Sequence, residues 1–143
     1  MYPTWAAVAA AITFVWLGMV LAISFLEAPL KFRAPGVTIP IGLGIGRLVF
    51  RALNLTEAVL AVVVVAAVAA GDPPGRVAGP AAAAVVLLLA QLFAVRPRLN
   101  RRSDRVLAGE DLPRSRDHLY YVALEAAKVA ALIALGIGLL TAG

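Results

Sequence analysis

Two apolar stretches of this chain are too short to cross a membrane unless charged residues cross with them. The run from Ala58 to Ala70 has 13 residues without a polar side chain. At about 1.5 Å per helical residue it covers about 20 Å, whereas the hydrocarbon core of a bilayer is about 30 Å thick. A spanning helix must therefore also take in Glu57 and Asn54. The last apolar run is short as well, and it draws Lys128 and Glu125 inward.

The composition places the chain among integral membrane proteins. Hydrophobic residues make up 62% of the 143 residues and charged residues 15%, and the mean hydropathy is +0.93. A soluble domain has about half apolar and about a quarter charged residues. Cysteine is absent, which excludes a disulfide framework, a thiolate metal site and a thiol nucleophile. The first apolar run has no basic flank and is longer than that of a signal peptide, which predicts a retained span.

We predict an all-α fold, an integral membrane bundle of four transmembrane helices in a single domain. The spans are expected at about 5–26, 53–70, 79–95 and 119–140, and the second may start as early as Leu48. Loops at about 27–52 and 96–118 connect them. Prolines and glycines in 34–46 indicate a re-entrant or interfacial connection. Arg96-Pro97-Arg98 is expected to end the third span, and Asp111 is expected to cap the fourth helix, with Pro113 in its first turn.

The basic residues orient the predicted bundle. The loop at 27–52 holds four of the 13 lysines and arginines and the loop at 96–118 holds seven, whereas the two tails hold none. The positive-inside rule places both loops in the cytoplasm and both termini outside the cell. The net charge of +5 thus reflects topology, and no nucleic-acid partner is predicted. A multi-pass protein of the cell (plasma) membrane is expected, and the composition, rich in Ala, Val and Arg, is consistent with a bacterial one.

With this orientation, every polar residue of the spans falls in the cytoplasmic half of the bilayer. The polar residues of the second and fourth spans also lie on one face of each helix, so the two faces are expected to meet. We therefore predict one polar cluster that binds a ligand or ion. Its candidate residues are Glu27, Lys31, Arg47, Arg51, Asn54, Glu57, Gln91, His118, Tyr121, Glu125 and Lys128.

The role of this cluster has three open interpretations. The first is a network of buried ion pairs that sets helix packing. Its pairs would be Glu27 with Lys31, Glu125 with Lys128, and Glu57 with Lys128 or Arg51. The second is movement of a proton or ion, because carboxylates beside a histidine titrate readily. The third is a metal site, against which the nearby arginines and lysine argue. A single His118 excludes haem held by two histidines, and no cofactor is predicted.

The stretch from Gly42 to Arg47 has two interpretations. Gly42 and Gly46 have the spacing that lets two helices pack closely, which is the favoured interpretation. Alternatively, a glycine-rich entry to a helix followed by Arg47 and Arg51 could bind a phosphate, and then an anionic lipid headgroup at the cytoplasmic face is expected. The arginine-rich loop at 96–118 predicts contact with anionic lipid in the same way.

Several short motifs resemble the opening of bacterial four-span membrane proteins of unknown function, which are distantly similar to the transmembrane protein 205 family. These motifs are Trp16-Leu17-Gly18-Met19, the segment 27–33, and Leu48-Val49-Phe50-Arg51. Arg96-Pro97-Arg98 and the position of His118 fit the same pattern. The resemblance implies a compact helical bundle and assigns no activity to any residue.

Two classes of function remain open at this point. The chain is either a small transport or binding protein for a proton, an ion or an anionic headgroup, or an accessory or scaffold subunit of a membrane complex. An enzyme is the less favoured class, because no Ser-His-Asp or Cys-His set is present. A chain of 143 residues encloses little volume, so a homo-oligomer or a larger complex is expected.

Overall fold

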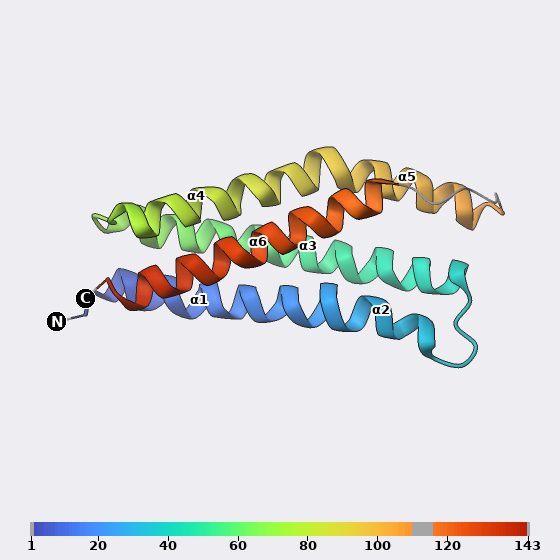
Figure 1. Ribbon diagram of the computed structural model, residues 1–143, viewed down its shortest axis with the longest axis horizontal. Coiled ribbons are helices and arrows are strands. Elements are labelled where there is room, and N and C mark those ends of the chain that lie inside the picture. Colours follow the sequence, from blue (N-terminus) through green and yellow to red (C-terminus); the bar gives the residue numbers. More distant parts are fainter. Residues whose placement is uncertain (1, 110–115, 143) are drawn as a thin grey trace.

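Helices account for all regular structure in residues 2–109 and 116–142, which this computed structural model describes, with backbone only at 116–118. They form four rods that lie side by side (Figure 1). The helices are α1 (Thr4–Val20), the π-helical segment η1 (Leu21–Glu27), α2 (Ala28–Leu30), the 3-10 turn η2 (Lys31–Arg33), α3 (Ile39–Ala70), α4 (Gly75–Ala90), the π-helical segment η3 (Gln91–Val95), α5 (Arg96–Leu107) and α6 (Arg116–Leu140).

Each rod is long and apolar enough to cross a membrane. The candidate spans are Thr4–Arg33, Ile39–Ala70, Gly75–Leu107 and Leu119–Leu140. The shortest has 22 residues and reaches about 33 Å at 1.5 Å per residue, which exceeds the hydrocarbon thickness of about 30 Å. An all-α bundle with four apolar helices, as the sequence predicted, is therefore confirmed. Which end faces the cytoplasm stays a prediction.

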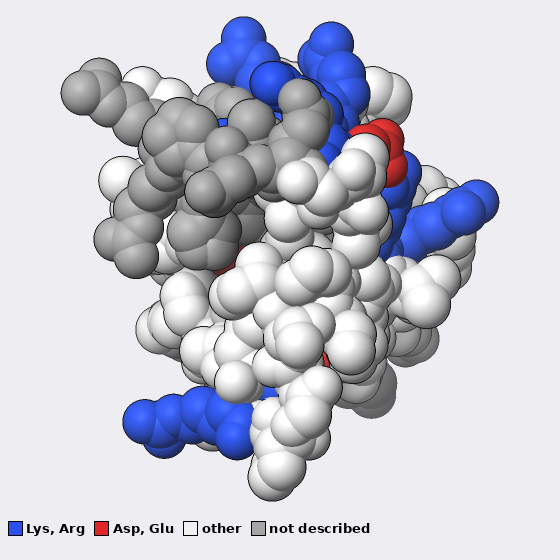
Figure 2. Space-filling model, turned by 90° about the vertical axis from the view of Figure 1, so that its right-hand side faces the viewer, with Lys and Arg blue, Asp and Glu red and all other residues white. Residues whose placement is uncertain are grey.

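The two ends of the bundle differ in chemistry. The terminal end holds both chain termini and the turn at 71–74, and the basic end holds the connection at 34–38 and helix α5 (Figure 1). Lysine and arginine side chains stand around the rim of the basic end (Figure 2). The loops rich in basic residues are thus gathered at one end of the molecule.

The second rod begins earlier than the sequence indicated. Helix α3 starts at Ile39 and includes most of the segment 34–46, for which a re-entrant or interfacial connection was expected. The helix forms because the Thr38 hydroxyl accepts a hydrogen bond from the amide of Ile41 (3.4 Å) and Pro40 lies in the first turn, where no amide partner is needed.

The glycines of α3 serve helix packing. Gly42 lies inside the helix against the ring of Phe32, and Gly46 lies against the Lys31 side chain, so a larger residue at either position would collide with the first rod. These amides belong to the helix interior and do not form an entry loop. The phosphate-loop interpretation of this stretch is therefore wrong, and the packing interpretation holds.

The third rod also runs further than expected. It continues past Arg96-Pro97-Arg98, where the span was predicted to end, and reaches Leu107 through η3 and α5. A proline inside a helix removes one hydrogen bond and pushes away the carbonyl four residues earlier. For Pro97 that carbonyl belongs to Phe93, within η3, and the wider π turn accommodates the loss. The first rod repeats this arrangement, because Pro29 is the second residue after η1, as Pro97 is after η3.

The terminal half of the bundle has an apolar core, in which Thr13 is a buried polar side chain. Helix α6 packs against α1 and α4, and α1 packs against α3. The fully buried side chains include Val64, Val77, Leu132, Leu135 and Leu139. Helices approach closely here, because a side chain at Gly136 would meet the ring of Phe14 and one at Gly138 would meet the backbone of Arg76. Helix α6 then runs diagonally away from α1 toward α5 (Figure 1).

Candidate functional site

Lys128 on α6 is completely buried and holds the centre of the bundle together. Its ammonium nitrogen Nζ lies 2.5 Å from Oε1 of Glu57 on α3 and 2.6 Å from Oε1 of Glu125 on α6. It also donates a hydrogen bond to Oε1 of Gln91 on η3 (2.8 Å). An ammonium group has three donors, so these three acceptors satisfy it fully. We call Glu57, Gln91, Glu125 and Lys128 the acid–lysine cluster.

The two carboxylates of the cluster receive further donors from the first and third rods. Trp16 on α1 donates its indole N–H to Oε1 of Glu57 (2.8 Å). Ser24 on η1 donates its hydroxyl to Oε2 of Glu125 (2.6 Å), and the Gln91 amide donates to Oε1 of Glu125 (3.2 Å). All four rods therefore meet at the acid–lysine cluster. Both oxygens of Glu125 have donors, a pattern that suits an ionised carboxylate.

Glu57 is different, because one of its oxygens has no partner. Its Oε2 is buried and makes no hydrogen bond among the described residues. The side chains of Glu57, Glu125 and Lys128 are at most 1% exposed. Two carboxylates against one ammonium leave the acid–lysine cluster one negative charge in excess when both acids are ionised. An unbalanced charge in a region without water costs several kcal/mol.

The depth of the cluster follows from its place on α3. Glu57 lies 13 residues before the end of that helix at Ala70, or about 20 Å from the terminal end at 1.5 Å per residue. If the apolar run begins at one membrane surface, Glu57 lies beyond the middle of a hydrocarbon core about 30 Å thick, on the side of the basic end. The cluster is thus remote from both surfaces.

The two π-helical segments supply cluster side chains from the first and third rods. Ser24 belongs to η1 and Gln91 begins η3. A π turn rotates the residues that follow it relative to a regular helix, and such turns are frequent at functional sites. The local cause is the proline after each segment, Pro29 and Pro97, as described above. The sequence therefore determines this placement through its prolines.

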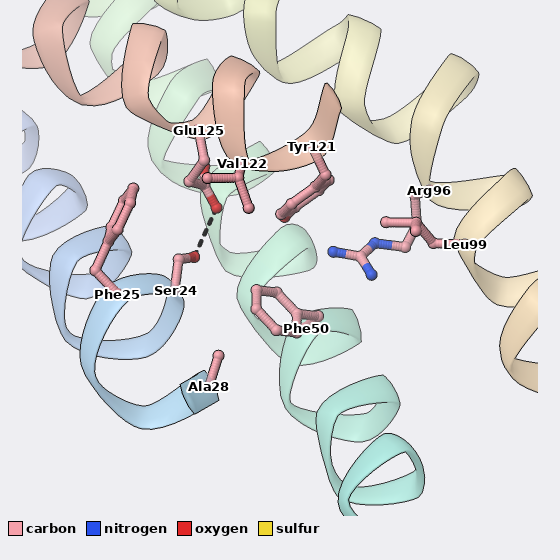
Figure 3. Close-up of a pocket in the computed structure, with 9 residues that line it drawn as sticks. All are labelled: Ser24, Phe25, Ala28, Phe50, Arg96, Leu99, Tyr121, Val122 and Glu125. Carbon is pink, nitrogen blue, oxygen red and sulfur yellow. Dashed lines mark hydrogen bonds between the residues drawn. The ribbon is translucent and has the colours of Figure 1, made fainter. Parts of the chain in front are cut away.

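A cavity of about 100 Å³ lies next to the cluster, on the side of the basic end. We call it the arginine pocket (Figure 3). It is lined by Ser24, Phe25, Ala28, Phe50, Arg96, Leu99, Tyr121, Val122 and Glu125. Glu125 with its Ser24 partner forms one wall, and the Arg96 guanidinium extends toward Phe50 and Tyr121 on the other (Figure 3).

Aromatic rings hold Arg96 in place. The guanidinium carbon lies 4.4 Å from the ring centre of Tyr121 and 4.8 Å from that of Phe50. The two rings meet edge to face, with centres 5.9 Å apart. Nevertheless Nε and Nη2 of Arg96 and the hydroxyl of Tyr121 are buried without a hydrogen-bond partner among the described residues. The arginine pocket thus presents donors that no described residue uses.

The structure divides the predicted polar cluster into separate groups. Glu57, Gln91, Glu125 and Lys128 come together, and Tyr121 lies beside them in the arginine pocket. The prediction that the polar faces of the second and fourth spans meet is confirmed by the contact between Glu57 and Lys128. The pairing of Glu125 with Lys128 also forms.

Four predicted members do not belong to this group. Glu27 and Lys31 form their own pair at the basic end (3.9 Å), Arg47 pairs with Asp104, and Arg51 is exposed. The prediction of one cluster is wrong for these residues, because they lie further along their helices toward the basic end. The side chains of Glu27, Arg47 and Arg51 reach the surface there, where charge costs little. That of Lys31 is only 10% exposed and lies against the rings of Phe32 and Phe50.

Two further predicted residues have other outcomes. Asn54 lies one helical turn before Glu57 on α3 and is buried, and its Oδ1 has no hydrogen-bond partner among the described residues. His118 lies on α6, but its side chain is outside the described part of the chain. The predicted cap at Asp111 and the first-turn proline Pro113 also lie outside it.

Sequence reasoning missed three residues of the site. Trp16 and Ser24 are neutral, so the search for charged residues in the spans passed over them, although a tryptophan in the middle of a span is unusual. Arg96 was counted as a topology residue, because Pro97 was taken as the end of the helix. In the described residues, no three His, Asp or Glu side chains are grouped as a metal site would require.

Comparisons with models of protein families, with curated proteins and with solved structures find no match for this chain. The resemblance to bacterial four-span proteins therefore stays a prediction. The function must be argued from the geometry of the acid–lysine cluster and the arginine pocket.

Proposed function

We propose that this protein is a small membrane transport protein that binds a proton at the acid–lysine cluster. The observation that supports the proposal is the presence of two fully buried carboxylates, Glu57 and Glu125, against one ammonium, Lys128. Lys128 contacts both carboxylates, and the next cation, Arg96, lies across the arginine pocket and forms no ion pair with either acid among the described residues. One carboxylate charge is thus left without a directly paired cation, and a buried unpaired charge is costly. A proton on that carboxylate would remove the charge.

The hydrogen bonds indicate where this proton binds. Lys128 and both oxygens of Glu125 are already engaged. Oε2 of Glu57 is the carboxylate oxygen of the cluster without a donor. A proton there would need no existing hydrogen bond to break. Glu57 is therefore the proposed proton site. The charges of Lys128 and Glu125 determine whether Glu57 is ionised or protonated.

The polar approach to the cluster is from the basic end, where the arginine pocket adjoins Glu125. The cavity of about 430 Å³ between α3 and α4 in the terminal half is lined by apolar residues such as Ala58, Val65 and Leu88. We infer that the proton enters from the basic end, and that release toward the terminal end requires the helices of the terminal half to separate. This is the behaviour of a carrier rather than of an open channel.

The alternative is an accessory or scaffold subunit in which the cluster only specifies helix packing. The specific observation in its favour is that Lys128 is fully satisfied and joins three of the four rods. A polar residue that contacts several helices can specify one arrangement of a bundle. This alternative predicts that neutral substitutions in the acid–lysine cluster change stability, and that the unaltered protein shows no transport.

The setting of the protein is also proposed. We infer that the basic end faces the cytoplasm of a bacterial cell, where its lysines and arginines contact anionic lipid, and that both termini are outside. A homo-oligomer or a subunit of a larger complex is the proposed assembly. A reporter that is active only in the cytoplasm, fused after Gly143, should give no signal.

The transport proposal is tested in liposomes that contain the purified protein and a trapped pH dye. An external pH step should change the internal pH faster than in protein-free liposomes, with valinomycin and potassium present to remove charge build-up. Glu57→Gln keeps the shape of the side chain and removes the ionisable oxygen, so it should abolish the flux. The matched control is Glu27→Gln, which changes a partly exposed carboxylate outside the cluster and should leave the flux unchanged.

Two results would contradict the proposal. One is a proton flux that survives Glu57→Gln. The other is the absence of proton flux from correctly folded protein, also when divalent cations, halides and small organic anions are added. Either result would favour the scaffold alternative.

A further inference from the structure

The arginine pocket carries an inference of its own. Arg96 presents Nε and Nη2, the two nitrogens on one edge of the guanidinium, as buried donors without a partner among the described residues. Two parallel N–H groups on one edge match the two oxygens of a carboxylate, and this bidentate pairing is the strongest that arginine makes. A buried donor without a partner costs about 1–3 kcal/mol. The pocket is therefore suited to an acceptor that the described residues do not supply.

A second unused donor lies in the same pocket. The Tyr121 hydroxyl is buried without a partner, and the Tyr121 ring contacts the Arg96 guanidinium, with 4.4 Å between the guanidinium carbon and the ring centre. Phe50 contacts the same guanidinium, with 4.8 Å between the guanidinium carbon and the ring centre, so two rings restrict the position of Arg96 before any ligand binds. Such preorganisation lowers the cost of binding.

The size of the cavity limits the ligand. The arginine pocket measures about 100 Å³, and one water needs about 10–15 Å³ of such space. The cavity thus has room for a small group of several atoms and not for a large head group. Its walls near the opening are apolar, formed by Phe25, Ala28 and Val122. A carboxylate with a short apolar tail fits both the donors and these walls.

We propose that the arginine pocket binds a small monocarboxylate, of the size of formate or acetate, with its two oxygens on Nε and Nη2 of Arg96 and a further hydrogen bond from Tyr121. This ligand is the transported substrate. That assignment rests on the proposed function, whereas the binding site itself does not.

Binding of the carboxylate is coupled to the proton. Glu125 lines the same pocket, so a bound anion lies near its negative charge, and a proton on the acid–lysine cluster relieves the repulsion. Among the described residues, Lys128 from α6 contacts both acids, and Arg96 and Tyr121 line the pocket together with Glu125. Lys31 lies further out, with its ammonium nitrogen 5.6 Å from the ring centre of Phe50. Gln91, Ser24 and Trp16 are neutral. Linkage is reciprocal, so each ligand must strengthen binding of the other by the same factor.

The test is titration of acetate into the full-length protein in phosphatidylcholine nanodiscs, followed by calorimetry. Sodium chloride at equal ionic strength is the control for general salt effects. A soluble short-chain phosphatidylserine forms a second arm, because its carboxylate would offer the same chemistry from a lipid. We expect saturable acetate binding, no heat of binding from chloride, and tighter binding of acetate than of the lipid. Binding of the lipid alone, or equal heats from acetate and chloride, would overturn the proposal.

Variants locate the site. Arg96→Gln should weaken acetate binding at least tenfold, and Arg96→Lys should weaken it as well, because an ammonium keeps the charge and loses the paired donors. Tyr121→Phe keeps the ring beside Arg96 and should weaken binding a few-fold. The matched control is Arg101→Gln, since Arg101 is exposed on α5 outside the pocket. Acetate binding that is unchanged in Arg96→Gln and Tyr121→Phe would refute the site.

The coupling is tested separately by proton uptake. Acetate binding measured in two buffers with different heats of ionisation reports the number of protons taken up. We expect uptake in the unaltered protein and its loss in Glu57→Gln. Acetate binding at Arg96 without proton uptake would refute the substrate role and the proposed function while leaving the binding site standing. Proton flux without acetate binding would refute the site and leave the proposed function standing.

Discussion

The terminal half and the basic half of the bundle are built from the same four rods in opposite ways. In the terminal half, glycine and alanine let the rods touch, and the interior holds Val, Leu and Ala. In the basic half, two π-helical segments widen the rods, and the interior holds the acid–lysine cluster and the arginine pocket. The closely packed apolar interior and the polar side chains of the candidate site therefore lie in different parts of the bundle axis. Substitutions in one half should therefore leave the property of the other intact.

The largest effect is expected where charge is buried. Lys128→Met removes the cation and leaves Glu57 and Glu125 unpaired at the centre of the bundle. Loss of one partner of a buried pair costs about 3–5 kcal/mol, so thermal unfolding in detergent should occur at a clearly lower temperature. Addition of Glu125→Gln should recover part of the loss. Losses that simply add would show that the three residues do not interact.

The next effect lies in the terminal half. Leu135→Ala opens a cavity in the apolar core, where Leu135 is completely buried. Such a change costs about 2–5 kcal/mol, measured as the same thermal shift. Ile133→Ala is the control, because Ile133 is exposed on the outer surface and should shift unfolding little. Acetate binding by Leu135→Ala at a temperature where it is folded should equal that of the unaltered chain. A weakened affinity would break the separation of the two halves.

A smaller effect is expected from Pro97→Ala. Without the proline the carbonyl of Phe93 regains its amide partner, η3 shortens and Gln91 rotates away from Lys128. Loss of a hydrogen bond to a charged group costs about 1.5–3 kcal/mol, and the restored helix bond offsets part of it, so the net change in stability should be about 1 kcal/mol. The affinity for acetate should also fall, and this fall should be easier to measure than the change in stability. Pro80→Ala, in α4, is the control, and an equal response of both variants would argue against a role for η3.

The smallest effect is expected from Glu27→Gln. Glu27 and Lys31 form a partly exposed pair at 3.9 Å on one helical face. Exposed pairs of this kind contribute less than about 1 kcal/mol. Thermal unfolding should move by a degree or less, and high salt should have the same small effect on the unaltered chain. A large shift would mean that this pair belongs to the buried interior after all.

The sequence predicted the fold and part of the site for physical reasons. Apolar runs shorter than a membrane force Glu57, Glu125 and Lys128 inside, so their meeting could be expected from length alone. Neutral partners such as Trp16 and Ser24 carry no such signal. Helix breaks were expected at Pro40 and Pro97, because a proline breaks a regular helix. Pro40 instead lies in the first turn of α3, and Pro97 lies two residues after a π-helical segment, where the helix continues.

The arginine pocket could not be predicted, since it depends on the angle between rods. Arg96 was expected in a loop, and its approach to Phe50 and Tyr121 requires three helices to be placed first. Local patterns carry no information about that placement.

The diagonal course of α6 has a mechanical consequence. Near the terminal end this helix is held tightly, because Gly136 and Gly138 let Phe14 and the Arg76 backbone lie directly against it. That contact acts as a pivot, and the part of α6 that runs toward α5 acts as a lever arm. Tyr121 lies 15 residues from Gly136, about 22 Å along the helix, so a tilt of about 5° moves it by about 2 Å. Lys128 is nearer the pivot and moves by about half as much. A small tilt of α6 about these contacts would thus change the arginine pocket about twice as much as it displaces Lys128.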